Sequence, residues 1–457
     1  MRGPHAVTLT HGWLPITLQV VAGAVLVAAI GWRSRRWRRL WVPVAALAGA
    51  ALAASVYWLI GYPGWAQDPA PAIMWVWIEL SGVAFVVAVV GWRGVRWWRR
   101  GMSLLAVPLC VLCAALALNM WVGYFPTVQS AWERATGTEP PRWVDESTLA
   151  AMQSRGARPT EGVVVKVTTP DTESGFAHRT EFVYLPPAWF ATTPPPKLPA
   201  VLMFGGEFGH PDDLLRSANV LGVLDEFTAR HRGNAPVVVF PDVGGQFSND
   251  TECVNGPRGN AADHVIKEVV PFTVARFGVS PDPANWGVAG WSAGGTCALL
   301  LAVLHPELFS AIVDLDGQLG PNAGTREQTI ARLFGGDEAA WAAFDPKTII
   351  TRHGRYSGMS AWFGVSTPTP TVYRDGTQTA PDPAPDWNTN SENHATTANA
   401  LCSLASGYGI ECAVVSQEAS HDFAGAGAAF EMALPWLAGK IGTPGVRPIP
   451  MPGAPAG

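Results

Sequence analysis

Four long apolar runs occupy the first 125 residues of this 457-residue chain and restrict how that part can fold. Each run reaches the roughly 20 residues that a helix needs to cross a bilayer core of about 30 Å. Inside a bilayer the backbone hydrogen bonds must close within a helix or a barrel, so runs of this length predict helices. We therefore expect residues 1–125 to form a four-helix anchor in a lipid bilayer, with runs at residues 13–32, 40–61, 73–92 and 102–125.

The short loops between these runs differ in charge. The first loop, RSRRWRR, contains five arginines, and the third, RGVRWWRR, contains four. The middle loop contains no basic residue. Because short arginine-rich loops stay in the cytoplasm, both ends of the helical unit should lie outside it. We expect a multi-pass membrane protein whose N-terminus and C-terminal part are extracytoplasmic.

A transporter is the alternative for the four helices. Charged residues inside membrane helices usually mark a transport path, but here Glu79 and Asn119 are the polar candidates. The sequence thus favours an anchor, and a unit that flips a lipid for the following domain is a weaker alternative.

The chain after residue 125 is acidic and is expected to be the functional part. It carries 21 basic and 34 acidic residues, which leaves no basic stripe to neutralise nucleic acid phosphates. We expect a linker at residues 126–160, a catalytic domain at 161–440 and a flexible Pro/Gly-rich tail at 441–457.

The stretch VAGWSAGG, residues 288–295, has the pattern of a buried strand that breaks into a helix at Ser292. Gly290 and Gly294 lie two residues on either side, where a sharp turn leaves no room for a Cβ. Such a turn strains the serine backbone and raises its hydroxyl above the sheet edge. Ser292 is therefore the expected nucleophile, and a structural serine turn is the alternative.

Short apolar β-branched segments and helical segments alternate through this part of the chain. This order predicts an α/β fold with a doubly wound, mainly parallel sheet. Ligand sites in such sheets lie beyond the carboxyl ends of the strands. The expected strands are residues 162–168, 180–185, 198–204, 236–240, 285–289, 311–315, 360–365 and 411–415.

A serine nucleophile needs a histidine to take its proton and a carboxylate to orient that histidine. His421 follows the last expected strand, where the base of this fold class is delivered, and is the expected base. His305, His353 and His394 are expected to be solvated or core histidines. The acid stays open between four residues after the strand at 360–365, namely Asp375, Asp382, Asp386 and Glu392.

From Pro199 onward the chain resembles the esterase-D-like branch of the α/β-hydrolases, and specifically the antigen 85 mycolyltransferases. The matching segments are FPDVGGQ at 240–246, KEVVP at 267–271, the serine turn, and LHPELF at 304–309. The resemblance implies that Glu392 is the acid, with Asp386 as second choice. It also implies that the backbone amides of Glu207 and Ala293 stabilise the oxyanion.

Six cysteines divide between the two parts of the chain. Cys110 and Cys113 lie in the fourth apolar run, where two small apolar residues are a simpler explanation than a redox pair. The other four lie in the outward part, where disulfides can form. We expect Cys402 to pair with Cys412 and Cys253 with Cys297.

These observations predict a membrane-anchored, outward-facing serine esterase or acyltransferase that needs no cofactor and no metal. Its substrate would be an acyl ester or a glycolipid, and the resemblance implies possible acyl transfer to a carbohydrate of the cell envelope. The alternative is a catalytically inactive envelope-binding or scaffold protein that kept the fold.

Overall fold

The computed structural model describes residues 7–31, 33–62, 70–92, 95–139, 142–367, 372–374 and 393–453. The chain forms two compact units, Met1–Thr138 and Glu139–Gly457. Residues 126–160, expected to be a linker, are therefore divided between the two units. The boundary of the second unit moves from residue 161 to residue 139.

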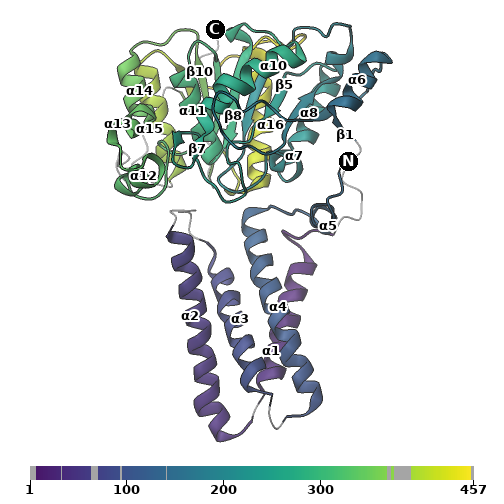
Figure 1. Ribbon diagram of the computed structural model, residues 1–457, viewed down its shortest axis with the longest axis vertical. Helices are drawn as coiled ribbons and strands as arrows, with labels where there is room; N and C mark the ends of the chain where they lie inside the picture. The colour runs from purple at the N-terminus through teal and green to yellow at the C-terminus, as the bar shows by residue number, and fades with distance from the viewer. Residues whose placement is uncertain are drawn as a thin grey trace. The chain divides into compact units, whose positions relative to one another are not determined.

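The first unit contains four helices that are long and apolar enough to cross a membrane, in the described part of the chain (Figure 1). Only 11–33% of each span is buried inside the unit, so most of its apolar surface remains available to lipid. Gly49 and Gly82 let two of the helices approach closely, because a Cβ on Gly82 would lie 2.8 Å from the Cα of Gly49. The four long helices are α1 (Trp13–Ile30), α2 (Val42–Gly61, preceded by the π-helical turn Trp37–Trp41), α3 (Ala72–Val90) and α4 (Trp97–Val122). The short helix α5 (Val128–Thr136) follows them.

The second unit contains a ten-stranded sheet with the order β1-β2-β3-β5-β4-β8-β9-β10-β12-β11 among the described residues. The six strands from β5 to β12 in this order are parallel, and β3 and β11 pair with them antiparallel. The doubly wound, mainly parallel sheet is confirmed. The strands are β1 (Trp143–Asp145), β2 (Val163–Val167), β3 (Glu181–Leu185), β4 (Ala200–Phe204), β5 (Val237–Phe240), β8 (Trp286–Trp291), β9 (Ala311–Leu315), β10 (Ser360–Ser366), β11 (Val372–Arg374) and β12 (Glu411–Gln417), with a separate hairpin of β6 (Asn255–Gly256) and β7 (Gly259–Asn260).

Helices cover both faces of this sheet (Figure 1). On one face α11 is apolar all round and buried from Ala293 to Val303, as a helix between a sheet and other helices should be. On the other face α16 packs with α8, and its Leu437 fills the space that a Cβ on Gly287 would need. The helices of this unit are α6 (Glu146–Ser154), α7 (Asp213–Arg216), α8 (Val220–Arg230), α9 (Ala261–Asp263), the π-helical turn η3 (His264–Val269), α10 (Val270–Phe277), α11 (Ala293–Leu304), α12 (Arg326–Phe334), α13 (Glu338–Ala343), α14 (Pro346–His353), α15 (His394–Gly407) and α16 (Phe423–Lys440), with 3-10 turns at Pro187–Phe190 and Pro283–Asn285.

Two segments at the ends of the second unit differ from expectation. The residues from Trp143 begin as strand β1, which pairs parallel with β2, before helix α6 starts at Glu146. Within the region expected to be a flexible tail, Ile441, Thr443 and Met451 are buried. Apolar contact with the domain therefore fixes the described part of this segment despite its Pro and Gly content.

Candidate active site

Ser292 lies in a sharp turn between β8 and α11. Its backbone has φ 58° and ψ −126°, a strained conformation for a residue with a side chain. A Cβ on Gly290 would lie 1.9 Å from the carbonyl oxygen of Gly294, and one on Gly294 would lie 2.3 Å from that of Gly205. Both glycines are thus required by backbone contact, and the turn exposes the Ser292 hydroxyl at the carboxyl end of the sheet.

His421 lies in the loop between β12 and α16. Its Nε2 is 3.1 Å from the Ser292 Oγ, a hydrogen-bonding distance. The next residue, Asp422, caps α16 by accepting a hydrogen bond from the Gly425 amide at 2.7 Å, which fixes the loop at the start of the helix. The structure therefore brings together the two side chains expected to be nucleophile and base, although 129 positions separate them.

A second histidine packs against this base. The rings of His394 and His421 stack with centroids 4.5 Å apart and an angle of 3° between their planes. Trp291 contacts His421 from β8, with ring centroids 5.0 Å apart. His394 was expected to be an ordinary solvated or core histidine, so its contact with His421 was not predicted.

Asp316 supplies the carboxylate that faces His421 within the described residues. It follows β9 directly, and its Oδ2 lies 3.6 Å from the Nδ1 of His421, an ion-pair distance longer than a hydrogen bond. The amide and the hydroxyl of Ser366 both donate hydrogen bonds of 2.7 Å to this carboxylate. Burial works against its ionisation, but His421 and His394 outweigh burial and keep the pKa of Asp316 below its usual value.

The expectation for the other four carboxylates stays a prediction. Glu392 and Asp386, like Asp375 and Asp382, lie outside the described residues. The sequence contained a signal for Asp316, because it directly follows the apolar strand after the nucleophile helix. Asp316 was not among the expected acids, because these were sought only after the following strand, β10.

The expected oxyanion donors line one pocket beside the nucleophile. After β4 the chain continues through Gly205, Gly206 and Glu207, and a Cβ on Gly206 would lie 3.6 Å from the Cβ of Ser292. Glu207 and Ala293 both line this pocket. Ala293 is the first residue of α11, where backbone amides have no partner within the helix. The structure thus places both predicted residues at the pocket wall.

Two buried acids, Asp250 and Glu252, line the same pocket. Burial raises the pKa of Asp250 to about 6. Burial and then the charges of Asp250 and Glu207 raise the pKa of Glu252 well above its usual value. The pair therefore retains a proton to higher pH than isolated carboxyl groups do, and in that form it can both donate and accept hydrogen bonds.

A disulfide joins this acidic loop to the helix that carries the nucleophile. Cys253 pairs with Cys297 on α11, and Cys402 on α15 pairs with Cys412 on β12. These are the pairs expected from the sequence. The first bond tethers Glu252, which precedes Cys253, to the nucleophile helix.

Comparison with known proteins agrees with this geometry. A family model described as a putative esterase matches residues 176–378. An uncharacterized protein of Corynebacterium glutamicum is 30% identical over 353 residues, which cover 77% of this chain and 81% of that protein. The chain belongs to the esterase family of α/β-hydrolases. It is a hydrolase by family.

Several solved structures are similar to the esterase domain at low identity. An S-formylglutathione hydrolase from Agrobacterium tumefaciens has a TM-score of 0.46 at 16% identity and covers 62% of this chain and 95% of its own. MPT51 of Mycobacterium tuberculosis has a TM-score of 0.40 at 16% identity, with 60% and 99% covered. A ferulic acid esterase has a TM-score of 0.45 at 17% identity, with 61% and 99% covered.

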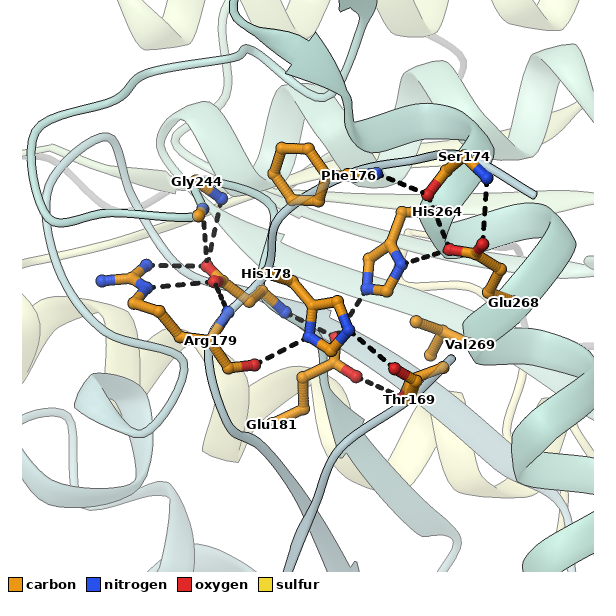
Figure 2. A network of polar contacts seen from close by, with 12 residues as sticks. Thr169, Ser174, Phe176, His178, Arg179, Glu181, Gly244, His264, Glu268 and Val269 are labelled. Carbon is orange, nitrogen blue, oxygen red and sulfur yellow. Dashed lines mark hydrogen bonds and ion pairs between the residues drawn. The ribbon is translucent and has the colours of Figure 1, made fainter. Parts of the chain in front are cut away.

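One group of side chains in the described part of the esterase could hold a metal ion by residue type, namely His178, Glu181 and His264 (Figure 2). Their geometry does not suit an ion. The two imidazole rings stack with centroids 4.3 Å apart and planes 22° apart, so their in-plane lone pairs cannot converge on one point between them. The hydrogen bonds of these three side chains instead indicate a structural role.

Proposed function

We propose that this chain is a membrane-anchored serine esterase or acyltransferase whose catalytic unit faces outward and acts on acyl esters. The observation that carries the proposal is the 3.1 Å contact between His421 Nε2 and Ser292 Oγ at the end of β8. The arginine-rich loops support the outward orientation, because they favour the cytoplasmic side of a membrane.

The reaction follows from the positions of these groups. His421 removes the proton of the Ser292 hydroxyl as its oxygen attacks the acyl carbon, and Asp316 stabilises the imidazolium that forms. The backbone amides of Glu207 and Ala293 stabilise the negative oxygen of the tetrahedral intermediate. His421 then gives its proton to the leaving alcohol, and an acyl-enzyme ester remains on Ser292.

The second half of the reaction decides between hydrolysis and transfer. Water or a carbohydrate hydroxyl attacks the acyl-enzyme as it loses its proton to His421. The ester bond to Ser292 then breaks, and His421 returns the proton to the Ser292 oxygen. The proton-retaining pair Asp250 and Glu252 beside the nucleophile supports a hydroxyl-bearing acceptor, because it can both donate and accept hydrogen bonds.

Labelling with a fluorophosphonate probe tests the proposal. We expect a covalent adduct on the full-length protein that disappears in Ser292→Ala and persists in Ser154→Ala, a matched change at an exposed position. Absence of an adduct on folded protein would instead support the scaffold alternative. Mass spectrometry of products from a soluble acyl ester, with and without a sugar acceptor, then separates hydrolysis from transfer.

A further inference from the structure

The group that resembles a metal site is part of a buried hydrogen-bond network around β3 and η3 (Figure 2). His264 is fully buried between two carboxylates: its Nδ1 lies 2.7 Å from Glu268, and its Nε2 lies 3.1 Å from Glu181. Burial opposes a charge on this ring, but the two carboxylates outweigh burial and raise the pKa of His264. Both ring nitrogens face carboxylate oxygens, which accept hydrogen bonds, so these contacts favour the imidazolium form of His264.

His178 stacks on this ring and makes an equivalent pair of contacts with the backbone. Its Nδ1 lies 2.8 Å from the carbonyl oxygen of Arg179, and its Nε2 lies 2.7 Å from that of Thr169. Both ring nitrogens of His178 therefore already have a hydrogen-bond partner in the backbone. A metal ion would have to displace the partners of both histidines.

The two carboxylates are satisfied in the same way. Glu268 accepts hydrogen bonds from the amides of Glu173 and Ser174, at 2.7 and 2.9 Å, and from the Ser174 hydroxyl at 2.7 Å. Glu181 accepts from the hydroxyl of Thr169 and, at 2.9 Å, from the amide of Asp242. A buried network with every member paired is rigid, so the position of Asp242 is fixed from this side.

Asp242 in turn binds Arg179. The Arg179 side chain donates to both carboxylate oxygens, with Nε 3.0 Å from Oδ2 and Nη2 2.7 Å from Oδ1, and its own amide donates to Oδ2 at 2.6 Å. Burial would raise the pKa of Asp242, but Arg179 keeps it below the usual value. Arg179 and Asp242 thus form an ion pair that is joined to the network through the Asp242 amide.

The Nη1 atom of Arg179 points away from this network and contacts the loop beside the active site, at Gly209 and His210. It donates to the carbonyl oxygen of Gly209 at 2.8 Å. Gly209 lies two residues after Glu207, whose amide is the proposed oxyanion donor, and all three residues line the pocket beside Ser292.

Other contacts also attach the loop at residues 205–211. The Gly209 amide donates to the carbonyl oxygen of Phe247 at 3.3 Å, and the His210 amide donates to the Asp213 carboxylate at 2.6 Å. The rings of Phe208 and His210 contact the ring of Phe247.

We propose that Arg179 is a positioning residue that holds the oxyanion loop in place, with the His178–Glu181–His264–Glu268 network as its rigid support. This inference rests on the proposed esterase function. Arg179 would act on the transition state through the Glu207 amide, not through contact with the reacting atoms. Loss of its bond to Gly209 would let this amide move away from the developing oxyanion.

The test compares Arg179→Gln and Arg179→Lys with Arg352→Gln, an exposed arginine on α14. Removing an oxyanion donor costs about 10²- to 10³-fold in kcat. We expect kcat for a soluble ester to fall at least about tenfold in Arg179→Gln, with KM little changed. Arg179→Lys, which keeps the charge opposite Asp242, should lie between this variant and the wild type. Arg352→Gln should match the wild type.

Binding of a transition-state analogue distinguishes a displaced oxyanion donor from a general loss of structure. Affinity for a boronic acid inhibitor should fall in parallel with kcat/KM across the Arg179 variants, while affinity for the alcohol product should not change. Unchanged kcat in Arg179→Gln, or an Arg179→Lys variant that does not fold, would overturn the proposal. Failure of the esterase function is a separate outcome, since the wild type itself would then show no turnover and no Ser292 adduct.

Discussion

Asp316 lies at the position where a carboxylate can orient the catalytic histidine, 3.6 Å from the Nδ1 of His421. We expect Asp316→Asn to lower kcat by about 10³- to 10⁴-fold, because the amide no longer stabilises the imidazolium. Steady-state hydrolysis of a soluble ester measures the effect. Glu392→Gln is the comparison, because the resemblance implies that Glu392 is the acid, and we expect this variant to retain more activity than Asp316→Asn. A large loss in Glu392→Gln with an active Asp316→Asn would return the role to Glu392.

Asp314, a buried acid on β9, should affect the stability of the fold and not the ester hydrolysis. Burial, reinforced by the nearby charge of Asp316 and opposed by the Gly317 amide, raises the pKa of Asp314 to about 7. The folded protein therefore binds this proton more tightly than the unfolded chain does. Its contribution to stability is present below the unfolded pKa near 4 and is lost as pH rises through 7.

Asp314→Asn tests this pH dependence. Between pH 4 and 8 the wild type should lose up to about 4 kcal/mol of unfolding free energy relative to the variant, which has no proton to release. Urea unfolding of the two proteins across this pH range measures the difference. Parallel stability curves would show that Asp314 ionises normally in the folded protein.

At the scale of elements, the turn between β8 and α11 depends on backbone contact. We expect Gly294→Ala to prevent folding or to displace β4, since the new Cβ would lie 2.3 Å from the backbone oxygens of Phe204 and Gly205. Gly407→Ala is the control, because nothing lies within 4 Å of a Cβ at this position near the end of α15. Thermal unfolding of both variants measures the effect, and a Gly294→Ala protein of normal stability would contradict it.

The two disulfides should differ in what they contribute. Cys253 and Cys297 close a loop of 44 residues, and Cys402 and Cys412 close one of 10. The chain-entropy model gives about 4 kcal/mol for the first bond and about 3 kcal/mol for the second. Paired Cys→Ala variants and urea unfolding measure the two values.

The two cysteine double variants should also differ in catalytic activity. The Cys253/Cys297 pair should also lower kcat/KM, because its bond tethers the pocket acid Glu252 to the nucleophile helix. The Cys402/Cys412 pair should leave turnover intact at temperatures where it is folded. Equal kcat/KM values in the two double variants would show that the Cys253–Cys297 bond does not affect the active site.

At the scale of the whole molecule, the prediction concerns the side of the membrane on which the esterase unit lies. On intact cells a membrane-impermeant maleimide should label Ala150→Cys, on exposed α6, but not Arg36→Cys, in the first arginine-rich loop. Both should be labelled after lysis, which controls for reactivity. The reverse pattern on intact cells would place the esterase in the cytoplasm.

The sequence alone determined the features that depend on local pattern. Run length and lack of charge predicted four helices able to cross a membrane, because the bilayer imposes its thickness on any spanning segment. The spacing of Gly290, Ser292 and Gly294 predicted the strained turn, because only glycine fits where a strand reverses into a helix. The alternation of strands and helices predicted the sheet.

Only the tertiary structure decided which distant groups meet. Asp316 faces His421 because β8, β9, β10 and β12 are neighbours in the sheet and their carboxyl ends meet at one edge, an order that the sequence does not state. The hydrogen-bond network around His264 likewise joins residues from β3, η3 and the turn after β5. Such contacts depend on long-range packing, whereas sequence patterns report the preferences of one segment at a time.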